Sequence, residues 1–259
     1  MSNEKIIRTQ AREALKGNIS LLIAAFAVIA ASAMFISQFS YLLLVALRVI
    51  DLDTEEIKKG AQWLGALIML GSATLGVLLT PMLNGFMRMA ADTVSKGGCE
   101  LATLFYYFRS PLRYFKSVVI NMSLVVLFSL LTLPADGAVN MLFGDSVLAA
   151  VLYGVGVLWK LFVFLFFIHY PLAAFAIDDS RGIFRYVFGY IGFSFRHGGA
   201  LIKLLLTMLG WISLCFFVVP MIYVVPYLET ALMNSARWLM APPRRAPGRS
   251  YFTQNNQSY

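Results

Sequence analysis

The sequence predicts an all-α integral membrane protein, built as a six-span helical bundle with basic amphipathic interfacial helices on the cytoplasmic side. Hydrophobic residues make up 59% of the 259 residues and the mean hydropathy is +0.75, whereas soluble chains are about 45–50% apolar. Several uncharged runs exceed the roughly 18–20 residues that a helix needs to cross a bilayer. The 21 lysine and arginine residues gather mainly in short segments between those runs.

Composition also narrows the functional class. A net charge of +8 would suggest nucleic acid binding in a soluble chain, but here the cations suit the cytoplasmic side of a membrane, so we expect no nucleic acid partner. Cys99 and Cys215 lie far apart and predict neither a disulfide framework nor a zinc site. The sequence contains no Walker loop, GxGxxG, HExxH or GxSxG motif. We therefore expect no catalytic residues, no cofactor, no metal and no enzymatic activity.

Residues 1–18 are predicted to form a short basic amphipathic helix on the membrane surface. Their cations recur at spacings of three and four, which keeps them on one helical face, and apolar residues take another face. The cations are Lys5, Arg8, Arg12 and Lys16, and the apolar residues are Ile7, Ala11 and Leu15. The alternative is a solvated charged leader that does not contact lipid.

Six apolar runs are expected to cross the membrane as one domain over residues 19–240. The runs cover residues 19–47, 61–87, 117–133, 147–177, 200–218 and 220–240. Residues 31–33 (Ala-Ser-Ala) match the pattern of a signal-peptidase site, but the apolar run continues to Leu47, which favours an uncleaved first span. Residues 134–145 are expected to form an outer loop. The tail, residues 241–259, is rich in Pro, Arg, Asn and Gln and is predicted to be disordered.

Cation counting decides between five spans and six. The run from Gly199 to Met240 could be one span followed by a surface helix, or two spans joined near Pro220. With six spans and a cytoplasmic N-terminus, 17 of the 21 Lys and Arg residues lie on the cytoplasmic side. Five spans would move the four arginines of residues 237–249 outside. The positive-inside rule therefore favours six spans, with both termini in the cytoplasm.

Two internal segments combine cations with aromatic side chains and are predicted to lie on the inner leaflet. In residues 88–116, apolar side chains recur at helical spacing and cations flank them. In residues 181–197, two arginines and two glycines would share one helical stripe, consisting of Arg185, Gly189, Gly192 and Arg196. Such arginines could bind a lipid phosphate, and a buried coupling helix is the alternative. The residues predicted to contact anionic lipid are Arg109, Arg113, Lys116, Arg185 and Arg196.

Two opposite charges lie at depth in the predicted spans. Lys160 interrupts the fourth span, where a charge costs about 2.5–3.5 kcal/mol on insertion scales and should find a partner. Glu229 is the only acidic residue inside any predicted span. We therefore predict an intramembrane Lys160–Glu229 pair. The alternative is that Lys160 extends towards the interface and Glu229 lies at one.

Other polar residues have simpler interpretations. His169 and His197 have no metal-ligand spacing with each other or with a cysteine, and packing roles are expected. Asp178 and Asp179 could bind a cation, but an exposed helix end is the simpler account.

Short motifs spread over most of the chain, and densest in residues 158–239, follow a common pattern. They are Arg12 to Asn18 (REALKGN), Leu158-Trp159, Tyr170-Pro171, Ala176 to Asp179 (AIDD), Ser194 with Gly198, Gly210-Trp211, and Pro226-Tyr227 with Ala231. Together they resemble a bacterial multi-pass membrane family, the domain-of-unknown-function family nine-seven-five. That family usually has glycines in its last outer turn, where this chain has Phe216 to Pro220 (FFVVP). The resemblance implies a six-span protein of the bacterial plasma membrane and carries no established activity.

The sequence thus predicts a non-enzymatic, multi-pass protein of the bacterial plasma (inner) membrane that binds or organises lipid or a membrane partner. Each Lys or Arg near the surface would contribute about 1 kcal/mol towards anionic lipid. The expected partners are membrane lipids, with a membrane protein partner or a second copy of the chain as further possibilities. The alternative function is a small-solute transporter or accessory permease subunit that uses Lys160 and Glu229 in the bundle interior.

Overall fold

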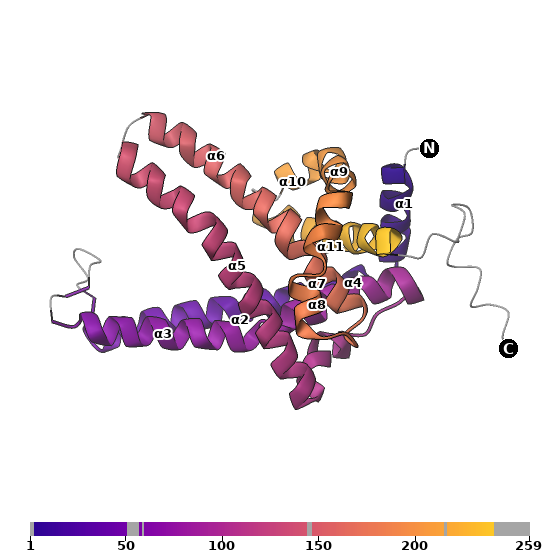
Figure 1. Ribbon diagram of the computed structural model, residues 1–259. Coiled ribbons are helices and arrows are strands. Elements are labelled where there is room, and N and C mark those ends of the chain that lie inside the picture. Colours follow the sequence, from indigo (N-terminus) through magenta and orange to yellow (C-terminus); the bar gives the residue numbers. More distant parts are fainter. Residues whose placement is uncertain (1–2, 51–56, 59, 144–146, 215–216, 241–259) are drawn as a thin grey trace.

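The computed structural model describes residues 3–50, 57–58, 60–143, 147–214 and 217–240 (Figure 1). These residues form helices and one isolated bridge between Ile50 and Ile57, with no β-strand among them, so the predicted all-α class is confirmed. The elements are α1 (Asn3–Leu15), α2 (Ile19–Ala46), α3 (Gln62–Leu79), α4 (Pro81–Lys96), η1 (Leu101–Arg109), α5 (Pro111–Phe143), α6 (Val147–Val163), η2 (Phe164–His169), α7 (Tyr170–Ile177), α8 (Ile183–Val187), α9 (Ile191–Thr207), α10 (Leu209–Leu214) and α11 (Val218–Met240). The predicted disordered tail, residues 241–259, lies outside the described residues.

Four stretches of helix are long and apolar enough to cross a membrane. They are Ile19–Ala46, Gln62–Lys96, Pro111–Leu133 and Val155–Ile177. They coincide with the first four predicted spans, and they support insertion of the chain into a membrane. The last two predicted spans do not reach this standard: the fifth is interrupted at Met208, between α9 and α10, and α11 carries Glu229 and Asn234.

The boundaries of the spans differ from the prediction at two places. The expected outer loop from residue 134 is wrong, because α5 continues as a helix to Phe143. The second span is also longer than expected, because α4 carries the helix past Arg88 to Lys96. Pro81 begins α4, where its missing N–H belongs to the first turn and its fixed φ suits a helix start.

Two helical hairpins, α2–α3 and α5–α6, project from the rest of the molecule as separate arms (Figure 1). In α3 the only buried residue is Gly65, and large apolar side chains such as Phe35, Trp63 and Leu70 are exposed along the first hairpin. A helix that is apolar on every side is stable in hydrocarbon, where its backbone groups are paired within the helix. The arms therefore have the surface of membrane-inserted hairpins.

The buried core lies where the arms meet, around α4. This helix packs against α1, α2, α7, α11 and η1, and most of its side chains are buried. Two glycines permit the closest approaches between elements. A Cβ on Gly85 would lie 2.0 Å from the carbonyl oxygen of Leu104 in η1, and one on Gly198 would lie 2.1 Å from the Phe166 ring. Side chains at these positions would separate the elements.

The N-terminal basic segment is helical, as predicted, and α1 is also docked on the core. Ile7, Ala11 and Leu15 are buried on one face. The Nδ2 group of Asn234 in α11 donates to the carbonyl of Ile7 at 3.1 Å. A membrane-surface helix would rest on lipid alone, whereas α1 is held in place by protein contacts across the sequence.

Candidate functional site

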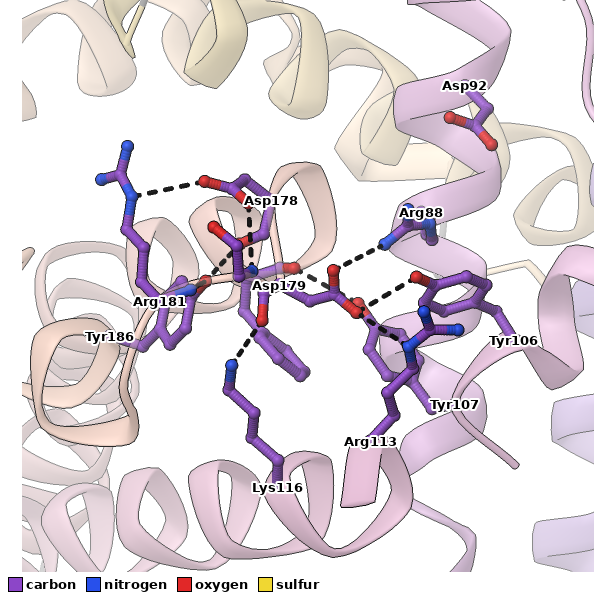
Figure 2. A network of polar contacts seen from close by, with 12 residues as sticks. Arg88, Asp92, Tyr106, Tyr107, Arg113, Lys116, Asp178, Asp179, Arg181 and Tyr186 are labelled. Carbon is purple, nitrogen blue, oxygen red and sulfur yellow. Dashed lines mark hydrogen bonds and ion pairs between the residues drawn. The ribbon is translucent and has the colours of Figure 1, made fainter. Parts of the chain in front are cut away.

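Asp179 lies at the centre of a group of charged and aromatic side chains, which we call the Asp179 cluster (Figure 2). It consists of Arg88, Tyr106, Arg113, Lys116 and Asp179. The Asp179 carboxylate lies 3.9 Å from Nη1 of Arg88 and 3.6 Å from Nε of Arg113. The Tyr106 hydroxyl donates to Oδ2 of Asp179 at 3.1 Å, and Nζ of Lys116 donates to the Asp179 backbone carbonyl. The cluster therefore joins α4, η1, α5 and the turn after α7.

Tyr106 organises the two guanidinium groups around the carboxylate. The Cζ of Arg88 lies 3.8 Å from the centroid of the Tyr106 ring, and the Cζ of Arg113 lies 4.6 Å from it. Both distances are in the range of cation–π attraction. Burial raises the pKa of the Tyr106 hydroxyl, so this group remains protonated and can donate to Asp179 at neutral pH.

The position of Tyr106 depends on how closely η1 approaches α4. Gly85 lies three residues before Arg88 in α4, and its missing side chain leaves room for the carbonyl of Leu104. The next residue but one in η1 is Tyr106. Its neighbour Tyr107 is fully buried and donates to the carbonyl of Phe175 at 3.2 Å, which ties η1 to α7.

The turn that presents Asp179 is itself held by hydrogen bonds. Asp178 accepts from the Ser180 N–H at 3.0 Å and pairs with Nε of Arg181 at 3.3 Å. Hydrogen bonds from Ser180, helped by the nearby Arg181, lower the pKa of Asp178. The Tyr186 hydroxyl donates to the Asp178 carbonyl and accepts from the Arg181 N–H, and burial raises its pKa to about 12. These contacts fix the backbone on both sides of Asp179.

The Asp179 cluster has the chemistry of a site that stabilises the packing of helices and not of a catalytic site. Three cations surround one carboxylate, so the cluster keeps an excess of positive charge. It holds no nucleophile with an adjacent base. Within the described part of the chain, no three His, Cys, Asp or Glu side chains are placed to hold a metal ion.

Comparison with known proteins adds no family to this description. No family model, no curated protein and no solved structure matches the chain. What the protein does is therefore inferred from its own residues.

Three of the predicted lipid-contact residues are engaged within the protein. Arg113 and Lys116 belong to the Asp179 cluster. Arg109 is exposed at the end of η1, and its Nη2 donates to the carbonyl of Ala102 at 3.2 Å. Lipid contact by these residues stays a prediction, but Arg113 and Lys116 already have a counter-charge or acceptor.

The other two lipid-contact candidates lie on a segment that is folded differently from the prediction. Residues 181–197 were expected to place Arg185 and Arg196 on one stripe of a helix. Instead, α8 ends at Val187 and α9 begins at Ile191, so a turn separates the two arginines. The single-helix stripe is therefore wrong. Both arginines are exposed, as both stripe glycines are.

The structure places Lys160 and Glu229 on helices with different neighbours. Lys160 lies on α6, which packs on α5, whereas Glu229 lies on α11, which packs mainly on α4 and α1. The ion pairs found among the described residues do not include one between Lys160 and Glu229. The Oε1 atom of Glu229 is buried and has no hydrogen-bond partner in this part of the chain. The pair stays a prediction.

Sequence reasoning missed the role of Asp179. The acidic pair was expected at an exposed helix end, but the Asp179 side chain is only 21% exposed. One signal was present in the sequence: residues 88–116 carry five cations, and the acidic pair is the first negative charge after the fourth span. The pairing could not be assigned, because Lys116 and Asp179 are 63 residues apart.

Proposed function

We propose that this chain is a non-enzymatic protein of the bacterial plasma membrane that binds anionic lipid at the inner leaflet. The α8–α9 junction, residues 183–196, would provide the contact through Arg185 and Arg196. The four membrane-length helices support an integral membrane location. The positive-inside distribution supports cytoplasmic termini and six spans. Membership of the domain-of-unknown-function family nine-seven-five is proposed only from the resemblance of the short motifs in residues 12–18 and 158–239.

The observation that carries this proposal is the exposure of aromatic side chains beside the two arginines. Phe184 is 80% exposed and Phe188 is 59% exposed, and their rings stack with centroids 6.4 Å apart. Exposed phenylalanine is unfavourable in water but favourable at the boundary between headgroups and acyl chains, where neighbouring arginines meet lipid phosphates. The turn at residues 188–190 would present both residue types to one leaflet.

The two arms give a reason to expect a membrane partner or a second copy of the chain. The hairpins diverge (Figure 1). Large apolar side chains are exposed on both of them, among them Phe35, Trp63, Leu130 and Leu158. Lipid can cover these surfaces, and so can the helices of another protein, because helix association in a bilayer depends on packing. Lipid binding is favoured here because exposed phenylalanine and arginine side chains lie together at the α8–α9 junction.

A small-solute transporter is the second candidate. Its support is a pair of buried polar atoms without hydrogen-bond partners in the described chain, Oε1 of Glu229 and Nε2 of His169. Unpaired polar atoms inside a membrane bundle mark ion or solute paths. In this function Lys160 would pair with Glu229 during transport. Expression lost in Lys160→Glu and Glu229→Lys should then return in the double variant, and no return would count against the pair.

The lipid proposal is tested with the full chain in nanodiscs of phosphatidylcholine with phosphatidylglycerol. Native mass spectrometry would measure the phosphatidylglycerol that remains bound. Arg185→Ala/Arg196→Ala should lower its retention about tenfold or more, since each near-surface cation contributes about 1 kcal/mol.

The matched control is Lys58→Ala/Lys59→Ala, which removes the same charge from the predicted outer side. Retention by this control should equal that of the unmodified chain. Equal retention in all three proteins would refute the lipid proposal.

A further inference from the structure

A hollow of about 300 Å³ lies between α1 and Tyr227 of α11, and we call it the α1 groove. Its lining is dominated by cations. The lining residues are Lys5, Arg8, Thr9, Arg12, Glu13, Lys16 and Tyr227. One carboxylate among four cations leaves a strong positive excess in a space large enough for a small anionic group.

The cations of the α1 groove outnumber the single carboxylate in its lining, which belongs to Glu13. Within the described chain, the side chains of Lys5, Arg12 and Lys16 form no ion pair and no hydrogen bond. Arg8 makes one contact, from Nη1 to the carbonyl of Thr207 at 3.0 Å, while its Nε is buried with no acceptor. A buried guanidinium N–H without an acceptor is costly, so the Arg8 side chain is not fully satisfied by the described residues.

The groove is preformed, because protein contacts hold α1 in place. Residues at spacings of three and four bring the cations onto one side of the helix, where they repel one another. The opposite side is buried, and the Asn234 side chain donates to the carbonyl of Ile7. Gln10 accepts from Nε1 of Trp238 at 3.3 Å. The free energy of docking α1 thus offsets the repulsion, and a bound anion would relieve it.

We propose that the α1 groove binds a phosphate monoester or diester. Such a group carries about one to two negative charges and several acceptor oxygens, and guanidinium groups match that geometry in two-point hydrogen bonds. The lysines at the two ends of the row add point charges. The site is independent of the α8–α9 junction, since it shares no residue with it.

The phosphate can come from a lipid headgroup or from a free organic phosphate, and two binding assays distinguish these sources. In the first, sn-glycerol 3-phosphate is titrated calorimetrically into the full chain in nanodiscs of phosphatidylcholine alone. In the second, native mass spectrometry measures retention of phosphatidic acid from mixed nanodiscs.

The decisive variant is Lys5→Gln/Arg12→Gln, because neither side chain forms an ion pair or a hydrogen bond with the described residues. It should weaken binding in at least one assay about tenfold or more, as expected for the loss of charge-assisted hydrogen bonds. Arg8→Gln should also weaken binding, and its melting temperature would show whether the lost Thr207 contact affects folding.

The matched control is Arg185→Gln/Arg196→Gln, which removes two cations from the other surface. It should leave glycerol phosphate binding unchanged even if it lowers phosphatidylglycerol retention. Binding of the soluble phosphate assigns the groove to free ligands, and a response confined to phosphatidic acid assigns it to a headgroup. No binding in either assay, or an equal loss in both double variants, would overturn the proposal.

Discussion

The Asp179 cluster and the α1 groove both contain more cations than carboxylates, but only the cations of the cluster form ion pairs within the described chain. In the cluster, two arginines share one partly buried carboxylate and a tyrosine ring, and a lysine donates to the backbone carbonyl of the same residue. In the groove, four cations line a hollow without an ion pair in the described chain. The comparison shows that a cation contributes to folding where a distant segment supplies its counter-charge. Where no segment does, the cation remains available to a ligand.

The two regions can be distinguished by measuring how charge removal changes the stability of the fold and how it changes ligand binding. Charges removed from the Asp179 cluster should destabilise the fold, and charges removed from the α1 groove should leave it stable. The predictions below test this division, from the largest expected effect to the smallest.

The largest effect is expected from Asp179→Asn. This change leaves Arg88 and Arg113 close together around Tyr106 without their carboxylate. Loss of one partner from a largely buried pair costs about 3 kcal/mol. The measurement is unfolding of the detergent-solubilised chain, followed by circular dichroism.

The control for this change is the neighbouring residue. Asp178→Asn removes a carboxylate from the same turn, but the Asp178 side chain is 43% exposed and pairs with one arginine. It should cost about 1 kcal/mol or less. Equal destabilisation by the two variants would mean that the Asp179 cluster contributes no more to stability than the exposed Asp178 pair.

Gly85→Ala should have the next largest effect. A methyl group here would meet the backbone carbonyl of Leu104, which cannot move without moving η1 and Tyr106. Overpacking of this kind costs about 1–3 kcal/mol. The control is Gly71→Ala on α3, where an added Cβ meets nothing within 4 Å and alanine favours the helix. A stable Gly85→Ala variant would show that α4 and η1 need not approach so closely.

Two double variants compare the regions directly. Arg113→Gln/Lys116→Gln removes two cations from the Asp179 cluster and should lower stability by about 1–2 kcal/mol through lost charged hydrogen bonds. Lys5→Gln/Arg12→Gln removes two from the α1 groove and should change stability by less than about 0.5 kcal/mol. Thermal unfolding of both proteins at one ionic strength gives the difference. A larger loss of stability in Lys5→Gln/Arg12→Gln would contradict a structural role for the Asp179 cluster and a binding role for the α1 groove.

The smallest effect is a pH dependence from Asp178. Its pKa is lower in the folded protein than the usual value of about 3.9, so the charged form stabilises the fold above that value. This stabilisation is lost as pH falls through the folded-state pKa. The melting temperature of the unmodified chain should therefore approach that of Asp178→Asn below about pH 4. A gap that stays constant down to pH 3 would exclude this contribution.

Local patterns in the sequence predicted much of the secondary structure. Apolar runs predicted six spans, of which four are helices of membrane length. The spacing of Ile7, Ala11 and Leu15 predicted an apolar face of α1, which was expected to meet lipid and is buried against the protein. Two local expectations failed. Residues 134–143 are helical although they carry Pro134, and the aromatic segment of residues 181–197 is divided by a turn.

The candidate sites depended more on contacts that are distant in sequence. Arg113 and Lys116 were predicted as lipid ligands from their position beside aromatic residues. Only the packing of α5 against the turn after α7 shows that Asp179 engages both. The α1 groove likewise needs Tyr227, which lies far along the chain from Arg8.

Length and polarity along the chain determined that this is an all-helical protein with membrane-length helices, because insertion energies depend on the number of consecutive apolar residues. Tertiary structure decided which cations form ion pairs within the protein and which remain accessible to a ligand. Electrostatic pairing acts through a few ångströms of space, and the chain brings Arg88 to Asp179 only when α4, η1, α5 and α7 have packed together.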